Sequence, residues 1–478
     1  NGDLNEALEH LNAAIKQNPD RMQYHMVGGH IYLDKKAYKK ALEEYGIARA
    51  DYEESPSLHY NCGLCQEGLG LKELALECFK KTLEYKEGYR DACEKIADYY
   101  KDRYTSFYDE ADYELALSYM NRQLAVKESC YYLVERGRIY MSAYKLNEAI
   151  RDFEKALEYV PNDWASYNNM GCCYKYMGQF EKGIECLKKA VECMGEEKSV
   201  LPYSNMADCY EALEQYQMAI ECYLKDLEMF PDRKVFHKEI GNLYLAMEDY
   251  DNALKYYEME PDLEDYYENV ATIYYLQGKE KQAIRTYEEG IRKASKEDKS
   301  DRFNDLAYFY NKILGDYKKA EYYYKKALAA ATDDGDRHEL EWKMASLYFG
   351  IGKKDNAKLF ARRALEHFQK AGYGKEEHYL KYEQYRPARL MRFGWIYICL
   401  GETEKGLDMF REMAKCRRCR QCRHKECFEA YQYMGRYYEI VGDYKTALEL
   451  YERAFAISSR DLVSEMAIKR IKKEIGRR

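Results

Sequence analysis

The chain has 478 residues, of which 46% are hydrophobic and 33% charged, and its formal net charge is −8. So small a net charge on a chain of this length argues against a general nucleic-acid binder, although it leaves room for local basic patches. With 7 prolines and 28 glycines, long disordered tails are not expected, and no run of eighteen apolar residues exists that would span a membrane.

A helical hairpin recurs along the chain, and residues 130–163 show it most clearly. Gly137 and Tyr140 fall on one face of a first predicted helix, and Ala149 and Phe153 on one face of a second, because their spacing matches the helical period. A proline then stops the second helix. Small residues let two backbones approach closely while aromatic rings fill the space beside them, so the pattern predicts packing and contains no catalytic chemistry.

In chain order, residues 1–21 match only the second helix of this unit. Full units follow, each predicted as two helices joined by a tight turn: 22–55, 56–89, 90–129, 130–163, 164–199, 200–233, 234–263, 264–299, 300–337, 338–371, 387–415 and 428–461.

A few stretches depart from the repeat. Extra residues occur near 101–110 and 372–386, and Pro261 ends one second helix early. A cysteine-rich segment, 416–427, lies between the last two full units, and an apolar stripe on 462–478 predicts a capping helix.

The 34-residue period has small residues at positions eight, twenty and twenty-seven and aromatic residues at eleven and twenty-four, and it resembles the tetratricopeptide repeat. About twelve full units and the opening half carry this resemblance, which covers nearly the whole chain. The resemblance implies an all-α fold, an α-α superhelix over residues 1–461. Its first helices would line a concave groove, its second helices would form the outer wall, and 462–478 would cap the end.

The resemblance also implies that positions two, five, nine and twelve of each first helix face the groove. In and beside that register Asn168, Asn169 and Asn205 form a polar stretch, together with Lys175 and Ser204. Their amides are expected to hydrogen-bond a peptide backbone, since an amide side chain both donates and accepts. Earlier in the chain the same register gives an acidic patch, formed by Asp91, Glu94 and Asp98.

One use of the family is a clamp for two carboxylates at the C-terminus of a chaperone. Lys238, Asn242 and Asn269 are similar to its first three residues. Asp301 and Asp305 stand where the clamp needs cations, and carboxylates facing carboxylates would repel. The sequence therefore argues against the clamp.

Large apolar residues map to groove positions near the C-terminal end. They are Trp342, Phe349, Met391, Trp395 and Ile398. Exposed apolar clusters mark binding surfaces and Trp is favoured at binding hot spots, so these residues are predicted to contact a partner. The alternative is that later segments fold over them as ordinary core.

Four cysteines within twelve residues do not fit the packing register: Cys416, Cys419, Cys422 and Cys427. Thiolates are suited to Zn²⁺, and four of them close a tetrahedral structural site, in which His424 is a substitute ligand. An iron–sulfur cluster and a metal-free loop are the alternatives. No cofactor is expected to be required for function.

No enzyme signature is found, because the chain lacks a phosphate-binding glycine-rich loop, a His-Glu-x-x-His helix and a nucleophile elbow. The twelve other cysteines fall within helical patterns, as small core residues do in a reducing cytosol, so a cytoplasmic location is predicted.

The sequence thus predicts a non-enzymatic scaffold that binds a protein or peptide in its groove. The half-unit start motivates an alternative, in which the chain is the sensor or regulatory arm of a larger signalling protein whose effector domain precedes residue 1. A weaker alternative is binding of RNA or another polyanion through the basic C-terminal end, where Lys469, Arg470, Lys472 and Lys473 cluster.

Overall fold

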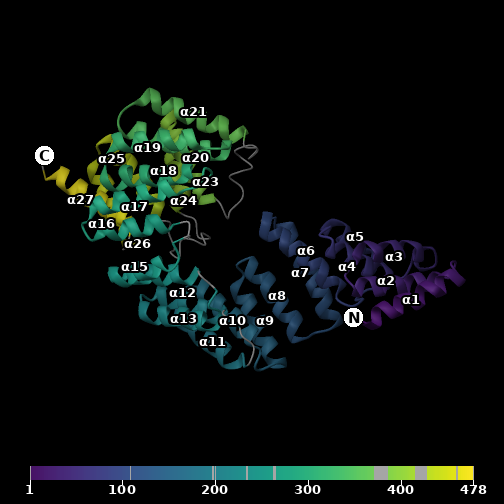
Figure 1. Ribbon diagram of the computed structural model, residues 1–478. Helices are drawn as coiled ribbons and strands as arrows, with labels where there is room; N and C mark the ends of the chain where they lie inside the picture. Colours follow the sequence, from purple (N-terminus) through teal and green to yellow (C-terminus); the bar gives the residue numbers. More distant parts are fainter. Residues whose placement is uncertain are drawn as a thin grey trace. The chain divides into compact units, whose positions relative to one another are not determined.

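The computed structural model describes residues 2–107, 109–195, 199, 201–232, 235–261, 265–370, 386–414, 428–458 and 461–476. Over these residues the chain forms α-helices and one π-helical segment, η1, and no strand, which confirms the predicted all-α fold (Figure 1). None of the described helices is long and apolar enough to cross a membrane. The chain divides into two compact units, unit 1 (Asn1–Leu213) and unit 2 (Glu214–Arg478).

Unit 1 is a series of helical hairpins that follows the predicted repeat. Its helices are α1 (Gly2–Gln17), α2 (Met22–Asp34), α3 (Tyr38–Tyr52), α4 (Pro56–Gly68), α5 (Lys72–Tyr85), α6 (Ala92–Phe107), α7 (Glu110–Val126), α8 (Cys130–Ser142), α9 (Leu146–Tyr159), α10 (Trp164–Tyr176), α11 (Phe180–Cys193) and α12 (Leu201–Ala212).

Unit 2 continues with hairpins of the same kind. Its helices are α13 (Tyr216–Met229), α14 (Val235–Ala246), α15 (Tyr250–Glu258), α16 (Tyr266–Leu276), α17 (Glu280–Lys293), α18 (Lys299–Tyr308), η1 (Phe309–Leu314), α19 (Tyr317–Ala330), α20 (Asp334–Gly350), α21 (Lys354–Lys370), α23 (Arg386–Leu400), α24 (Thr403–Ala414), α25 (Phe428–Val441), α26 (Tyr444–Ile457) and α27 (Leu462–Ile475).

The hairpin of α8 and α9 shows how the repeat is specified. The side chain of Ser129 caps α8 by accepting a hydrogen bond from the backbone N–H of Tyr132. Tyr144 makes the turn with φ 60°, in the left-handed region. Gly137 faces Phe153 so closely that a Cβ at Gly137 would lie 2.4 Å from the ring. The predicted small-against-large packing is therefore confirmed in this hairpin.

First helices of successive repeats lie against each other within unit 1. α2 contacts α4, α6 contacts α8, and α10 contacts both α8 and α12, whereas the second helices of neighbouring repeats approach one another less closely. The array therefore bends with its first helices on the inner side, and positions on those helices that face inward form the concave face of unit 1.

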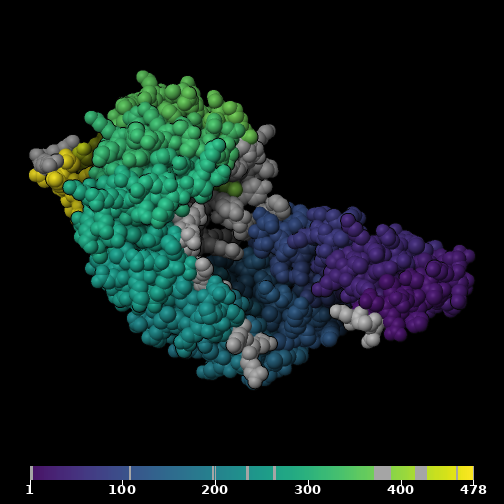
Figure 2. All heavy atoms as spheres, viewed as in Figure 1, coloured from purple at the N-terminus to yellow at the C-terminus, as the bar shows by residue number. Residues whose placement is uncertain are grey.

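The repeats of unit 2 close on themselves. One core cluster takes buried residues from helices between α16 and α26, and the hydroxyl of Tyr275 in α16 donates to the sulfur of Met466 in α27, at 3.5 Å. Figure 1 shows α27 beside α16. On the face shown in Figure 2, the side chains of the teal and green helices of unit 2 form one continuous surface. The last helices thus cover concave positions of earlier repeats in the same unit.

Several departures from the repeat take definite structural forms. α15 is only nine residues long, as the early proline predicts, and the extra residues near 101–110 extend α6. η1 was not predicted; it continues α18 and ends at Gly315, whose φ is 68°. On α27 the buried residues are Ser464, Ala467 and Ile471, whereas Ile475 of the expected stripe is exposed. The expected insert at 372–386 lies almost wholly outside the described residues.

Candidate functional site

The predicted polar stretch comes together on the concave face of unit 1. The amide of Asn205 in α12 donates to Oδ1 of Asn168 in α10, at 3.1 Å. The ammonium of Lys175 donates to Oδ1 of Asn205 at 2.8 Å and to Asp208 at 2.9 Å. Four polar side chains from two successive repeats thus form one network.

Asn168 is buried at 6% exposed, whereas the other three side chains of the network keep limited contact with solvent. The side chain of Lys175 is 14% exposed and that of Asp208 is 34% exposed. Burial acts to lower the pKa of Lys175, but the Asp208 carboxylate outweighs it, so the pKa is raised and the ammonium stays charged. Asn169 also lies in this region and has no hydrogen-bond partner among the described residues. The network offers amides and paired charges to a ligand.

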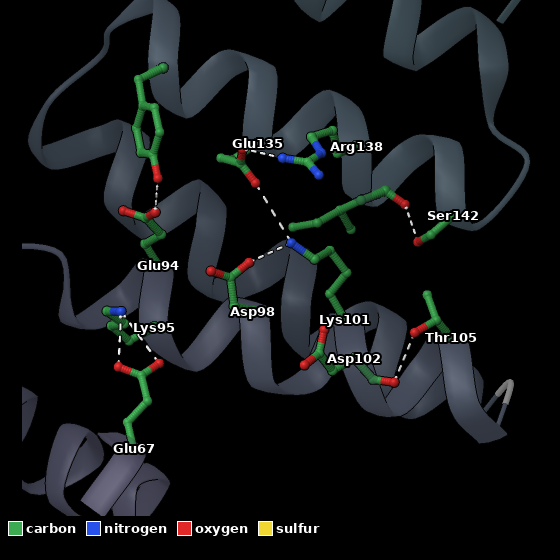
Figure 3. Close-up of polar contacts among 12 residues, drawn as sticks. Glu67, Glu94, Lys95, Asp98, Lys101, Asp102, Thr105, Glu135, Arg138 and Ser142 are labelled. Atoms are coloured by element: carbon green, nitrogen blue, oxygen red, sulfur yellow. Dashed lines mark hydrogen bonds and ion pairs between the residues drawn. The ribbon is translucent and has the colours of Figure 1, made fainter. Parts of the chain in front are cut away.

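The predicted acidic patch is largely neutralised by its neighbours (Figure 3). Lys101 lies between Asp98, at 2.5 Å, and Glu135 of α8, at 3.6 Å, and Arg138 pairs with the other oxygen of Glu135 at 2.9 Å. The hydroxyl of Tyr60 donates to Asp91. The acidic residues therefore hold neighbouring repeats together and do not form a bare negative surface.

Glu94 is the most enclosed member of this patch, at 6% exposed. Burial raises the pKa of Glu94, and the hydroxyl of Tyr131, which donates to its carboxylate at 2.5 Å, partly opposes that effect. The ring of Tyr131 remains 56% exposed. Its hydroxyl is thus fixed by Glu94 while its ring is open to solvent, so it presents an oriented apolar surface.

The apolar residues predicted to contact a partner lie within or against the core of unit 2, which is the alternative that the sequence left open. Trp342, Trp395 and Ile398 are 6%, 1% and 1% exposed. Phe349 and Met391 are partly buried and pack against the same cluster. The physical reason is the closure of unit 2: the ring of Phe349 stacks on Tyr437 of α25 with 6.4 Å between centroids, so a later repeat covers the cluster.

The residues compared with the carboxylate clamp are engaged with other partners in unit 2. Lys238 pairs with Asp265, and Asn242 accepts a hydrogen bond from Tyr257. Burial, with Glu268 as a further cause, raises the pKa of Asp305 to about 7. Asp305 is paired with Arg302 at 3.4 Å and supplies no cation where the clamp needs one, in agreement with the argument against the clamp.

The basic C-terminal end is mostly paired. Lys469 pairs with Glu465, Arg470 with Glu439, and Lys472 with Glu452. These ion pairs reduce the positive charge available to a polyanion.

The four-cysteine segment, with Cys416, Cys419, Cys422 and Cys427, and His424 lie outside the described residues. Within the described residues no group of three or more His, Cys, Asp or Glu is placed to hold a metal ion. The other twelve cysteines are free thiols, six of them buried, as expected for small core residues.

Comparison with known proteins agrees with this architecture. Tetratricopeptide repeat profiles match residues 1–56, 130–163, 164–232, 237–265 and 304–337. These stretches are tetratricopeptide repeats, as the resemblance implied. Tetratricopeptide repeats build protein–protein interaction scaffolds and are generally non-catalytic.

Two curated proteins and one solved structure illustrate the likeness. Hsp70-Hsp90 organizing protein 3 of Arabidopsis thaliana is 23% identical over 202 residues, and TPR repeat-containing protein MJ1428 of Methanocaldococcus jannaschii is 25% identical over 205 residues. The alignments cover 40% and 41% of this chain, but only 34% and 31% of the relatives' lengths. A tetratricopeptide repeat protein from Parabacteroides merdae aligns at 18% identity with a TM-score of 0.41, over 53% of this chain and 98% of that one.

Three residues of the unit 1 surface were not singled out from the sequence: Tyr131, Glu135 and Asp208. The signal was present for two of them, because Tyr131 is at position two of its tetratricopeptide repeat and Asp208 is at position nine. Their inter-repeat contacts become visible only when neighbouring first helices are placed side by side.

Proposed function

We propose that the chain is a non-catalytic, cytoplasmic scaffold that binds an extended segment of a protein partner on the concave face of unit 1, between α6 and α12. The observation that carries this proposal is the network of Asn168, Asn205, Lys175 and Asp208. Amide side chains that project from successive repeats match the repeating donors and acceptors of an extended backbone.

Exposed apolar residues occur on α8, the first helix before this network, and on α12, which carries part of it. Tyr131 on α8 is 56% exposed and Leu201 at the start of α12 is 52% exposed, and both occupy position two of their repeats. A segment with apolar side chains at its ends and polar groups between them would complement this surface. Because Lys175 and Asp208 carry opposite charges, the partner segment is proposed to have little net charge near them.

The polar stretch, rather than the concave face of unit 2, is proposed as the site because Lys175, Asn205 and Asp208 retain contact with solvent, although Asn168 behind them is buried. The regulatory-arm and polyanion alternatives stay predictions, and the pairing of Lys469, Arg470 and Lys472 favours neither.

The test is selection of binding peptides from a displayed library on the full chain, followed by affinity measurement with variants. The double variant Asn168→Ala and Asn205→Ala is expected to weaken a selected peptide by about 5- to 100-fold, since each lost hydrogen bond contributes about 0.5–1.5 kcal/mol. Asn147→Ala, on the exposed face of α9, is the matched control and should leave the affinity unchanged. Equal affinity for the double variant and the wild type would refute the proposed site.

The structural zinc expected from the cysteine-rich segment is a separate proposal. Four thiolates would close the coordination shell, so the ion would fix the geometry between two repeats and would take no part in partner binding. Metal analysis of protein purified without chelator tests it.

A further inference from the structure

Two carboxylates of the acidic patch in unit 1 are paired with tyrosine hydroxyls and not with cations. Asp91 accepts a hydrogen bond from the hydroxyl of Tyr60, and Glu94 accepts one from the hydroxyl of Tyr131 at 2.5 Å. Neither carboxylate forms an ion pair with the residues that the structure describes. A hydroxyl is a neutral donor, so it satisfies a carboxylate oxygen without cancelling the negative charge.

The two lysines of α6 are engaged with other carboxylates (Figure 3). Lys95 pairs with Glu67 of α4 at 3.0 Å. Lys101 pairs with Asp98 at 2.5 Å and with Glu135 of α8 at 3.6 Å. The lysines of this helix therefore do not neutralise the two carboxylates that are paired with tyrosines.

Glu94 is thus a buried carboxyl group in negative surroundings. Burial raises its pKa, the hydrogen bond from Tyr131 acts in the opposite direction, and three nearby carboxylates raise the pKa further. The second carboxylate oxygen of Glu94, Oε2, makes no hydrogen bond with the described part of the chain and is not fully enclosed, so it reaches solvent. A cation at this oxygen would favour the ionised form of Glu94.

The pair formed by Tyr60 and Asp91 shows how this chain completes such an arrangement. The guanidinium of Arg90 lies over the ring of Tyr60, with 5.0 Å between Cζ and the ring centroid. A cation in this place is attracted by the negative face of the ring. The ring of Tyr131 contacts Tyr132 edge-on at 5.3 Å between centroids, no cation of the described residues lies over it, and it is more than half exposed.

We propose that the partner segment carries an arginine whose guanidinium lies over the ring of Tyr131 and donates to Oε2 of Glu94. This inference rests on the proposed binding of an extended segment to unit 1 and names one side chain of that segment. The aliphatic part of the arginine would supply the apolar contact at Tyr131, and its charge would complement Glu94. Arginine suits the site better than lysine, because a planar guanidinium can stack on a ring and donate to a carboxylate at the same time.

The experiment selects a displayed library of random peptides in parallel on the full wild-type chain and on two variants. In Glu94→Gln the side chain still accepts from the hydroxyl of Tyr131 but has no charge. Glu154→Gln, at an exposed glutamate of α9, is the matched control. Peptides selected on the wild type and on the control are expected to share an arginine at one fixed position, and peptides selected on Glu94→Gln are expected to lack this enrichment.

Affinity measurements with one peptide selected on the wild type give the size of the effect. Replacing its arginine by glutamine is expected to weaken binding to the wild type by about 10- to 100-fold and binding to Glu94→Gln by less than about 5-fold, because a hydrogen bond to a charged group is among the stronger contacts. Tyr131→Leu, which changes an exposed side chain, is expected to weaken the same peptide by about 3-fold or more.

The outcomes separate this inference from the proposed function. Peptides that depend on Asn168 and Asn205 but have no enriched arginine would overturn the inference and leave the proposed function standing. An arginine penalty as large on Glu94→Gln as on the wild type, or an unchanged affinity for Tyr131→Leu, would do the same. Peptides whose arginine depends on Glu94 but whose affinity is unchanged by the double asparagine variant would refute only the polar network as the site, and selection of no peptide would overturn both proposals.

Discussion

The packing of small residues against aromatic rings can be tested at Gly137. A methyl group added there would lie 2.4 Å from Cε1 of Phe153, and the ring is fully buried. The ring cannot swing away because Ala149 and Ala156 on either side of it in α9 are also fully buried. Gly137→Ala should therefore destabilise the α8–α9 hairpin, although alanine is the better helix former.

The expected size follows from two opposing effects. Overpacking a filled core costs about 1–3 kcal/mol, and replacing a helical glycine by alanine gains about 1 kcal/mol, so Gly137→Ala should lose up to about 2 kcal/mol. Gly46 in α3 is the matched control, because nothing lies within 4 Å of the position its Cβ would take. Gly46→Ala should gain about 0.5–1 kcal/mol.

Hydrogen exchange of the full chain, read by mass spectrometry on peptides from α8 and α9 and from α3, measures these local free energies. A single unfolding midpoint would not suffice, because a chain with two compact units does not unfold in one step. If hydrogen-exchange protection of the α8–α9 peptides rises in Gly137→Ala as much as that of the α3 peptides rises in Gly46→Ala, the packing argument is refuted.

Three further predictions concern unit 2 and the cysteine-rich segment. Asp305→Asn should raise the unfolding free energy of unit 2 by about 1–2 kcal/mol at pH 8 and leave it unchanged at pH 4. The reason is that a folded pKa of about 7 makes the wild type lose stability as the pH rises from about 4 to 7. Urea titrations that show equal gains at both pH values would contradict this prediction. Glu439→Gln should cost about 3–5 kcal/mol, seen as lost hydrogen-exchange protection in α27, because the largely buried Arg436 and the partly buried Arg470 both lose their carboxylate. Glu452→Gln, which breaks an exposed pair, should cost less than about 1 kcal/mol. Protein purified without chelator should contain about one zinc ion per chain at residues 416–427, and a ratio near zero would remove the site.

Periodicity was sufficient to predict the local architecture. The hairpins, the packing of Gly137 against Phe153 and the short α15 all follow from interactions within about 34 residues, which a single sequence displays directly. That Asn168 and Asn205 lie near each other was also predictable, because neighbouring first helices bring positions five and six of successive repeats together.

The closure of unit 2 was not predictable in the same way. A superhelix accumulates a small rotation at each interface between repeats, so the meeting of Tyr275 with Met466 depends on the sum of several such rotations. The π-helical segment η1 adds to the difficulty, because it alters the register of the helix that carries Lys312. No short stretch of sequence encodes either feature.

The two units use equivalent repeat positions for opposite purposes, and the chemistry of the side chains reflects the difference. Position five is Asn168 in α10 but Trp342 in α20, and position twelve is Lys175 in α10 but Phe349 in α20. In unit 1 these positions hydrogen-bond to the next repeat, and Lys175 keeps some contact with solvent, whereas in unit 2 they enter or pack against a core that later helices cover. A large apolar residue costs free energy when it faces water, so an apolar run at groove positions favours closure of the superhelix over an open binding surface. Polar groove positions are therefore the better guide to where this chain meets a partner.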